Sequence, residues 1–283
     1  MVHRVGAFGL AAVLTSACGR LDFEPRPDAP AAVGTDQDLD GVADPVDNCP
    51  ARGNPDQADE EGDGIGDACD ACPIYVGDAD RDGDGVGDAC DAHPDAPDET
   101  LAFFDGFASF EPAAWDTFGD GTWSQITPGE VHYDSVSVNP GALLRPTIYA
   151  PQLAMFGAFR LVAKEQTNTT IALIDAVDLA PQDGEKCGVG ALHTIDPRLA
   201  TGDFTGNASI AEQQVAWPGS TTDGTVYRLI LDHQTATLGC TGLDATVTAG
   251  VSQPALRTSG QAGVRVRGVD ADLLYLLIIT GPP

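Results

Sequence analysis

Carboxylates recur at fixed spacing in the N-terminal third of this 283-residue chain. Three twelve-residue segments, 36–47, 59–70 and 80–91, carry acidic side chains at positions 1, 3, 5, 9 and 12 and a glycine at position 6. In a tightly curved loop, alternate residues point their side chains toward one centre, and glycine permits the sharp turn. Oxygen atoms gathered in this way are typical ligands of a hard divalent cation.

The three loops predict calcium sites. Ca²⁺ takes about six to eight oxygen ligands, whereas Mg²⁺ is smaller, prefers about six and retains its waters. Without a cation, converging carboxylates repel by roughly 1 kcal/mol per close pair even in water. At position 7 the backbone carbonyl binds, so the side chain there is free to be apolar. The predicted ligands are Asp36, Asp38, Asp40, Val42, Asp44 and Asp47, then Asp59, Glu61, Asp63, Ile65, Asp67 and Asp70, then Asp80, Asp82, Asp84, Val86, Asp88 and Asp91.

A disordered acidic linker that holds cations loosely is the alternative, since low hydrophobicity with high charge is typical of disorder. The glycine at position 6 of every loop favours ordered sites. Position 12 is Asp rather than the Glu of EF-hands, and no helical flanks are evident. We therefore expect a structural role for calcium, with folding coupled to the ion, rather than a sensor's opening motion.

The sequence around the loops resembles thrombospondin type 3 repeats. The phrases that carry the resemblance are Asp47-Asn48-Cys49-Pro50, Asn54-Pro55-Asp56-Gln57, Gly66-Asp67-Ala68-Cys69-Asp70 and Gly87-Asp88-Ala89-Cys90-Asp91. The resemblance implies that residues 36–98 wrap calcium ions with almost no hydrophobic core and that successive cysteines pair. Glu61 replaces an Asp, and the third unit lacks the first two phrases, which leaves any further ion site there open.

Seven cysteines and the N-terminal segment indicate an exported chain. Residues 1–18 have the basic start, short apolar stretch and small residues of a signal peptide, and Thr15-Ser16-Ala17-Cys18 resembles a bacterial lipobox. Thr15 departs from the usual Leu or Val, so an ordinary signal peptide is the alternative. If Cys18 is lipidated, six cysteines remain, and their spacing predicts the disulfides Cys49–Cys69, Cys72–Cys90 and Cys187–Cys240.

Charge and composition separate the rest of the chain into parts. The formal net charge is -29, of which residues 36–98 contribute -18, so nucleic acid is not an expected partner. Residues 19–35, rich in Pro and Ala, predict a flexible tether that holds the folded part away from a membrane surface. No later segment is apolar enough to span a bilayer, so we expect membrane contact only through the lipid anchor.

Residues 100–283 predict a mainly β domain. Short alternating or apolar runs are broken by Gly, Pro and Asp, which suits an antiparallel two-sheet sandwich or jelly roll. The segments 104–107, 227–231, 260–265 and 274–276 resemble those of concanavalin A-like, laminin-G-like domains, which implies that fold. That fold is used for glycan or protein binding in many relatives and for glycoside hydrolysis in others, so it does not choose between these functions.

No catalytic residues are expected. The paired-carboxylate string of a retaining glycosidase is absent, and Asp175 with Asp178 is its nearest approach. Trp115, Trp123 and Trp217 predict core packing, with a sugar-stacking platform as the alternative.

We expect an exported, calcium-binding lipoprotein, anchored to the bacterial outer membrane or secreted, whose repeats form a spacer and whose sandwich binds a glycan or protein in adhesion. A secreted hydrolase with an unrecognised active site and a purely structural envelope component are the alternatives.

Overall fold

The computed structural model describes most of the chain after the N-terminal segment. The described residues are 35–77, 79–137, 139–146, 148, 150–180, 182–205, 208–258 and 260–281. The signal peptide predicted for residues 1–18, its lipobox cysteine Cys18 and the tether up to residue 34 lie outside this set. Within the described residues, no helix has the length and apolar character needed to cross a membrane.

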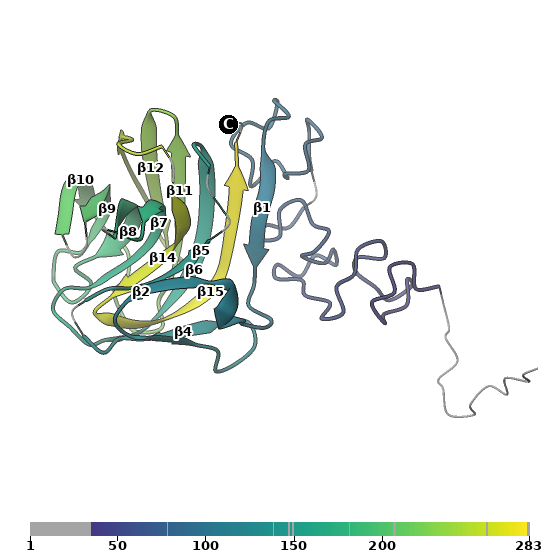
Figure 1. The fold of residues 1–283 in the computed structure, drawn as a ribbon, viewed down its shortest axis with the longest axis horizontal. Helices are drawn as coiled ribbons and strands as arrows, with labels where there is room; N and C mark the ends of the chain where they lie inside the picture. The colour runs from purple at the N-terminus through teal and green to yellow at the C-terminus, as the bar shows by residue number, and fades with distance from the viewer. Residues whose placement is uncertain are drawn as a thin grey trace, which may run out of the picture.

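Two antiparallel sheets pack face to face, as the sequence predicts for residues 100–283 (Figure 1). The eight-stranded sheet has the order β13 (Thr248–Pro254), β12 (Thr237–Leu243), β11 (Val226–Gln234), β6 (Leu153–Lys164), β15 (Val269–Thr280), β4 (Val131–Asp134) and β3 (Thr122–Ser124), and β1 (Thr100–Asp105) also pairs with β15. The seven-stranded sheet has the order β10 (Ala208–Ala216), β9 (Arg198–Thr205), β8 (Asp183–Gly190), β7 (Thr170–Asp178), β14 (Gln261–Arg267), β5 (Gly141–Arg145) and β2 (Asp116–Gly119). A 3₁₀ turn, η1 (Pro112–Ala114), precedes β2.

The main hydrophobic core lies between the two sheets. Strand β11 shows how the sequence builds it, because buried Tyr227, Leu229 and Leu231 alternate with more exposed residues. Successive side chains of a strand point to opposite faces, so this period-2 pattern places one apolar face inward. The disulfide Cys187–Cys240 joins β8 to β12 across the core. A cross-link that closes a loop of this length stabilises a chain by about 4 kcal/mol in the chain-entropy model.

Strands β6 and β15 are apolar on both faces because the acidic repeats cover the outer face of their sheet. Met155, Leu276 and Ile278 face the inter-sheet core. On the outer face, residues of both strands form a second cluster with residues of the repeats. Its members are Cys72, Val86 and Cys90 of the repeats and Ala154, Phe156, Ala158, Tyr275, Leu277 and Ile279 of the sandwich. The last repeat is therefore packed against the sandwich.

Residues 35–98 form successive turns with no helix or strand among those described. The disulfides Cys49–Cys69 and Cys72–Cys90 close two loops within this segment, and both pairs match the spacing-based prediction. In Figure 1 the later turns lie alongside β1 and the earliest turns extend away from the sandwich. The C-terminal part of these residues is therefore docked on the sandwich, and their N-terminal part extends away from it.

A polar network is buried inside the sandwich. His233 of β11 donates through Nδ1 to Asp175 of β7, and the same nitrogen lies 3.6 Å from Glu185 Oε2 of β8. All three side chains are at most 1 % exposed. Burial raises the pKa of Asp175 and of Glu185. Burial acts to lower the pKa of His233, but the hydrogen bond to Asp175 and the charges of both acids outweigh it and raise that pKa.

This network predicts that stability falls as pH rises above about 6.5, the ordinary histidine value. The folded protein holds protons on these groups that the unfolded chain releases, so their contribution is present at lower pH and lost through the raised pKa of His233. The slope should approach about 1.4 kcal/mol per pH unit for each proton involved. Urea unfolding between pH 6.5 and 9 in saturating calcium measures it. His233→Gln should flatten the slope, and equal slopes in both proteins would contradict the assignment.

Candidate metal sites in the repeats

The first loop, residues 36–47, is shaped by hydrogen bonds from its backbone to its own carboxylates. Asp36 at position 1 accepts from the N–H groups of Leu39, at 2.7 Å, and Gly41, at 3.3 Å. Asp40 at position 5 accepts from the N–H of Val42 at 2.8 Å. Short Asp side chains bond readily to nearby backbone N–H groups in this way, which stabilises turns. The acidic residues therefore fix the curvature of the loop.

The loops at 59–70 and 80–91 repeat the same hydrogen bonds. The position-1 carboxylate accepts from positions 4 and 6, at 2.8 and 3.0 Å in the second loop and at 2.7 and 3.0 Å in the third. Position 5 accepts from the N–H of position 7 at 2.9 Å in both. Position 9 accepts from the N–H of position 2 in all three loops, at 2.8 to 2.9 Å. One local geometry is thus built three times.

Glycine at position 6 is required by the backbone conformation. Gly41, Gly64 and Gly85 have φ values of +100°, +95° and +94°. These values lie outside the conformations that other residues adopt readily. No atom lies within 4 Å of the place where a Cβ would stand at any of the three, so the restriction is conformational and not one of space.

Positions 3 and 12 have a different environment from the rest of each loop. A carboxylate oxygen of each is buried and has no hydrogen-bond partner among the described residues. These atoms are Asp38 Oδ2 and Asp47 Oδ2, Glu61 Oε1, Glu61 Oε2 and Asp70 Oδ2, and Asp82 Oδ2 and Asp91 Oδ2. In each loop, oxygens from positions 1, 3 and 5 lie within 4.8 Å of one another. Such a set can satisfy its charge by binding a divalent cation.

Burial and the neighbouring acids raise the pKa of the position-3 carboxylate in each loop. Burial and the nearby carboxylates of Asp70 and Asp63 raise the pKa of Glu61 to about 8. Burial and the neighbouring acids also raise the pKa of Asp38 and of Asp82. A nearby positive ion acts in the opposite sense, because it favours the charged form of each carboxyl.

The second oxygen of position 5 ties each loop to the chain that follows it. Asp40 Oδ2 accepts from the N–H of Asn54 at 2.7 Å. Asp63 Oδ2 accepts from Gly77 at 3.1 Å, and Asp84 Oδ2 from Glu99 at 2.9 Å. The last of these bonds reaches the residue just before β1. The third loop is therefore connected to the first strand of the sandwich through a predicted ligand residue.

Glu99 is a residue of this region that the sequence analysis missed. Its carboxylate accepts from the N–H of Ala92 at 3.2 Å and lies 2.9 Å from His93 Nδ1. Burial and the nearby carboxylate of Asp91 raise its pKa to about 7. Glu99 lies outside the twelve-residue spacing, so the pattern that identified Asp91 gave no signal for it. It brings another carboxylate beside position 12 of the third loop.

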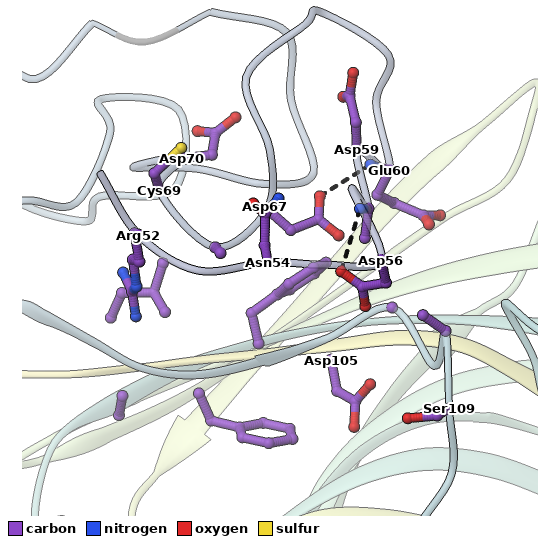
Figure 2. Close-up of a pocket in the computed structure, with 18 of the residues that line it drawn as sticks. Arg52, Asn54, Asp56, Asp59, Glu60, Asp67, Cys69, Asp70, Asp105 and Ser109 are labelled. Atoms are coloured by element: carbon purple, nitrogen blue, oxygen red, sulfur yellow. Dashed lines mark hydrogen bonds between the residues drawn. The ribbon is translucent and has the colours of Figure 1, made fainter. Parts of the chain in front are cut away.

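An acidic cavity of about 1100 Å³ separates the second loop from the sandwich. Figure 2 shows Asp59, Glu60 and Asp67 of the repeats on one side and Asp105, at the end of β1, on the other. Asp67 accepts from the N–H of Glu60 at 2.9 Å. Burial is the main cause that raises the pKa of Asp67 to about 6 and the pKa values of Glu60 and Asp105 above their usual range. Carboxyl groups thus lie on both sides of the cavity, whose lining also includes Arg52 and Arg145.

The sandwich carboxylates singled out by sequence are not paired in a cleft. Asp175 is fully buried and bonded to His233. Asp178 is exposed at the end of β7, where it accepts from the N–H of Ala180 at 3.0 Å. Between them the strand bulges at Ala176, which has a φ of 51°. No sequence pattern indicated that Glu185 and His233 would meet Asp175, because these residues come from separate strands.

Two of the three tryptophans are core residues. Trp115 and Trp217 are 7 % and 3 % exposed and belong to the inter-sheet core. Trp123 is partly buried and packs on Tyr133, with ring centroids 4.8 Å apart. Core packing is thus confirmed for Trp115 and Trp217, and Trp123 lies at the edge of the same core.

The comparison with protein families supports the repeats. Residues 33–57 and 79–96 match the model of the thrombospondin type 3 repeat. These ranges contain the first and third loops, and the second loop between them has the same hydrogen-bond geometry. A comparison with curated proteins finds no match.

Solved structures similar to the chain are β-sandwich proteins. A carbohydrate-binding module from Bacillus subtilis is 14 % identical over 56 % of this chain and 91 % of its own, with a TM-score of 0.43. Lectin II from Ulex europaeus is 12 % identical over 64 % and 100 %, with a TM-score of 0.44. A galectin-like protein of unknown function from Bacillus subtilis is 13 % identical over 64 % and 96 %, with a TM-score of 0.48. Of all these comparisons, the repeat match bears directly on the loops.

Proposed function

We propose that this chain is an exported calcium-binding protein in which three calcium ions order residues 36–98 and hold them on a β-sandwich that binds an extracellular glycan or protein. The observation that carries the proposal is the pair of buried, partnerless carboxylate positions in each loop, at positions 3 and 12. Leaving such charges without a partner is costly, and a divalent cation offsets that cost. Calcium suits these sites because its coordination is flexible and entirely by oxygen.

The docked third repeat gives calcium a second effect. Val86 supplies the position-7 carbonyl and is also fully buried against the outer face of the eight-stranded sheet. Folding of such loops is coupled to the metal, because the ligands cannot be gathered without it. Calcium at the third loop would therefore keep Phe156, Tyr275 and Leu277 covered, since these outer-face residues pack in the same cluster as Val86.

The binding role of the sandwich is supported by the character of its polar residues. The buried acids Asp175 and Glu185 are held with His233 inside the core, which suits a structural network and not a water-filled catalytic cleft. A hydrolase would need carboxylates that flank a bound sugar, about 5 to 9 Å apart in an accessible site. A binding function is therefore favoured over a hydrolase function. If no ligand binds the sandwich, the alternative is a purely structural role in the cell envelope.

Export and anchoring are inferred from the N-terminal sequence and the disulfides. Three disulfides are expected in a chain that folds outside the reducing cytosol. Lipidation of Cys18 would attach the protein to the bacterial outer membrane, with residues 19–35 as the tether; a processed but unlipidated chain would be secreted. A cysteine that carries more than one acyl chain supplies enough apolar surface for stable attachment to a membrane.

Calcium binding is tested by calorimetric titration of the Cys18→Ser chain. We expect three ions for this protein and two after Asp82→Asn with Asp91→Asn, because positions 3 and 12 of the third loop lose their charge. The matched control is Asp95→Asn, which removes an exposed carboxylate that pairs with Arg81 outside the ligand set. Three ions retained by the double variant, or an ion lost by the control, would contradict the assignment.

Limited proteolysis tests whether calcium orders the repeats. With a chelator, residues 36–98 should become sensitive to protease, and a dye that reports exposed apolar surface should bind the uncovered outer face of the eight-stranded sheet. The sandwich itself should remain intact, since its core lies between its two sheets. Equal protease resistance with and without calcium would remove the proposal.

Membrane anchoring has its own test. Cys18→Ser should move the protein from the membrane fraction of the expressing bacterium to the soluble fraction, because the acyl chains supply the attachment. Fractionation followed by detection of the protein measures the shift. Membrane association that is unchanged by this substitution would refute lipidation at Cys18.

A further inference from the structure

The outer face of the seven-stranded sheet contains a groove of about 320 Å³ that the calcium sites do not involve. Its lining comes from β7, β8, β9, β10 and β14 and from the loop before β7. Side chains of β14 alternate between the two faces, so Val264 and Val266 point into the core while Arg265 and Arg267 point outward. The groove therefore lies on the face opposite the inter-sheet core.

The strand register explains why this face is hollow. One row across the sheet contains Arg265, Ala172, Gly188 and Ala200, from β14, β7, β8 and β9 in turn. Alanine and glycine thus follow one another along the row, beside the long side chain of Arg265. A Cβ at Gly188 would lie 2.6 Å from the Cβ of Ala172, so glycine is required by the close approach of the two strands. The floor is low because these positions carry almost no side chain.

The neighbouring rows place positively charged side chains on either side of that floor. The row next to it contains Arg267, Thr170, Gly190 and Arg198. The row on the other side contains Lys186, whose partner on β9 is Gly202, which in turn pairs with Glu212 of β10. Since paired residues of a sheet share a face, these side chains converge on one depression.

The charge of the groove is opposite to that of the molecule. Lys186, Arg198, Arg265 and Arg267 line it together with the carboxylate of Glu212, and Asp196, outside the lining, pairs with Arg198. The whole chain has only 14 Lys and Arg residues against 43 Asp and Glu. A cluster of four cations is therefore a marked local exception, and a depression lined by one sign of charge attracts ligands of the other.

Several of the cations are held in place by the protein. Lys186 Nζ lies 3.3 Å from Glu212 Oε2. The guanidinium of Arg265 lies over the ring of Phe204, 4.8 Å from its centroid. With its amide oxygen turned toward Arg267, Asn168 accepts from that side chain at 3.1 Å. Side chains fixed in this way lose little further freedom when a ligand binds.

The positively charged side chains of the groove also repel one another. Burial and the charge of Arg267 lower the pKa of Arg265 to about 10. Burial lowers the pKa of Lys186, where the charges of Arg265 and Arg267 oppose that of Glu212. Lys186 and Arg265 are only 7 % and 3 % exposed, so their mutual repulsion is weakly screened by solvent. An anion in the groove would relieve it.

We propose that this groove binds an acidic sugar unit, carrying either a carboxylate or a sulfate group. The arginines and Lys186 pair with the anionic group, because guanidinium bonds such groups in a bidentate fashion. Thr167, Thr170 and Gln214 of the lining offer hydrogen bonds to neutral hydroxyl groups. The volume suits one or two sugar units, and the acidity of the rest of the chain opposes a long polyanion such as nucleic acid. This inference rests on the proposed glycan-binding function and specifies its ligand.

Calorimetry on the Cys18→Ser chain in calcium tests the groove with defined probes. These are a galacturonic acid disaccharide, a sulfated galactose disaccharide, the neutral galactose disaccharide, and inorganic sulfate and phosphate. We expect an acidic disaccharide to bind at least tenfold more tightly than the neutral one and than either inorganic ion, with an affinity that falls as salt rises. Arg267→Gln and Arg198→Gln should each weaken that binding about tenfold or more.

The matched control is Arg52→Gln, which removes one positive charge from an exposed position in the repeats, away from the groove. It should leave the affinity unchanged, and equal melting temperatures should show that all three variants fold. Neutral and acidic disaccharides bound equally well, without an effect of Arg267→Gln, would overturn the inference and leave glycan binding in place. Inorganic sulfate bound as tightly as the acidic sugars would overturn sugar recognition. Binding of none of the sugars would overturn both the inference and the glycan part of the proposed function.

Discussion

Convergence of carboxylates is the constraint on which the repeats depend. Within each loop, positions 1, 5 and 9 use their oxygens to hold the backbone, while positions 3 and 12 keep a buried oxygen without a protein partner. The same side-chain chemistry thus serves two purposes, because Asp can both cap a turn and bind a cation. A segment with so few apolar residues has little hydrophobic stabilisation of its own, and a bound cation would supply the interaction that its composition lacks.

The third loop links this cation-dependent segment to a conventional hydrophobic core. Position 7 needs only a backbone carbonyl, which leaves the side chain of Val86 free to pack with the Cys72–Cys90 disulfide against Phe156 and Leu277. Asp84 adds a hydrogen bond to the backbone of Glu99, immediately before β1. The repeats and the sandwich are therefore connected through packing and through a predicted ligand residue, so we expect the order of the third loop to affect how much of the sheet is covered.

Charge is segregated between the two ends of the structure. Acidic side chains gather in the loops and along the cavity between the second loop and Asp105, whereas four of the cations gather in the groove on the seven-stranded sheet. Like charges come together only where something compensates them or where their repulsion favours a ligand. We propose calcium as that ligand in the loops and an acidic sugar as its counterpart in the groove.

The sequence by itself determined the features that depend on local spacing. Residues close together in the chain set the ligand positions and glycines of the loops, the two disulfides within the repeats and the alternation of the strands. Only the tertiary structure decided what depends on distant strands: the meeting of Asp175 with Glu185 and His233, the place of Glu99 beside Asp91, and the cationic rows of the groove. Only the tertiary structure showed that β15 is buried on both faces and that the repeats cover its outer face, because apolar burial has no direction and any apolar surface satisfies it.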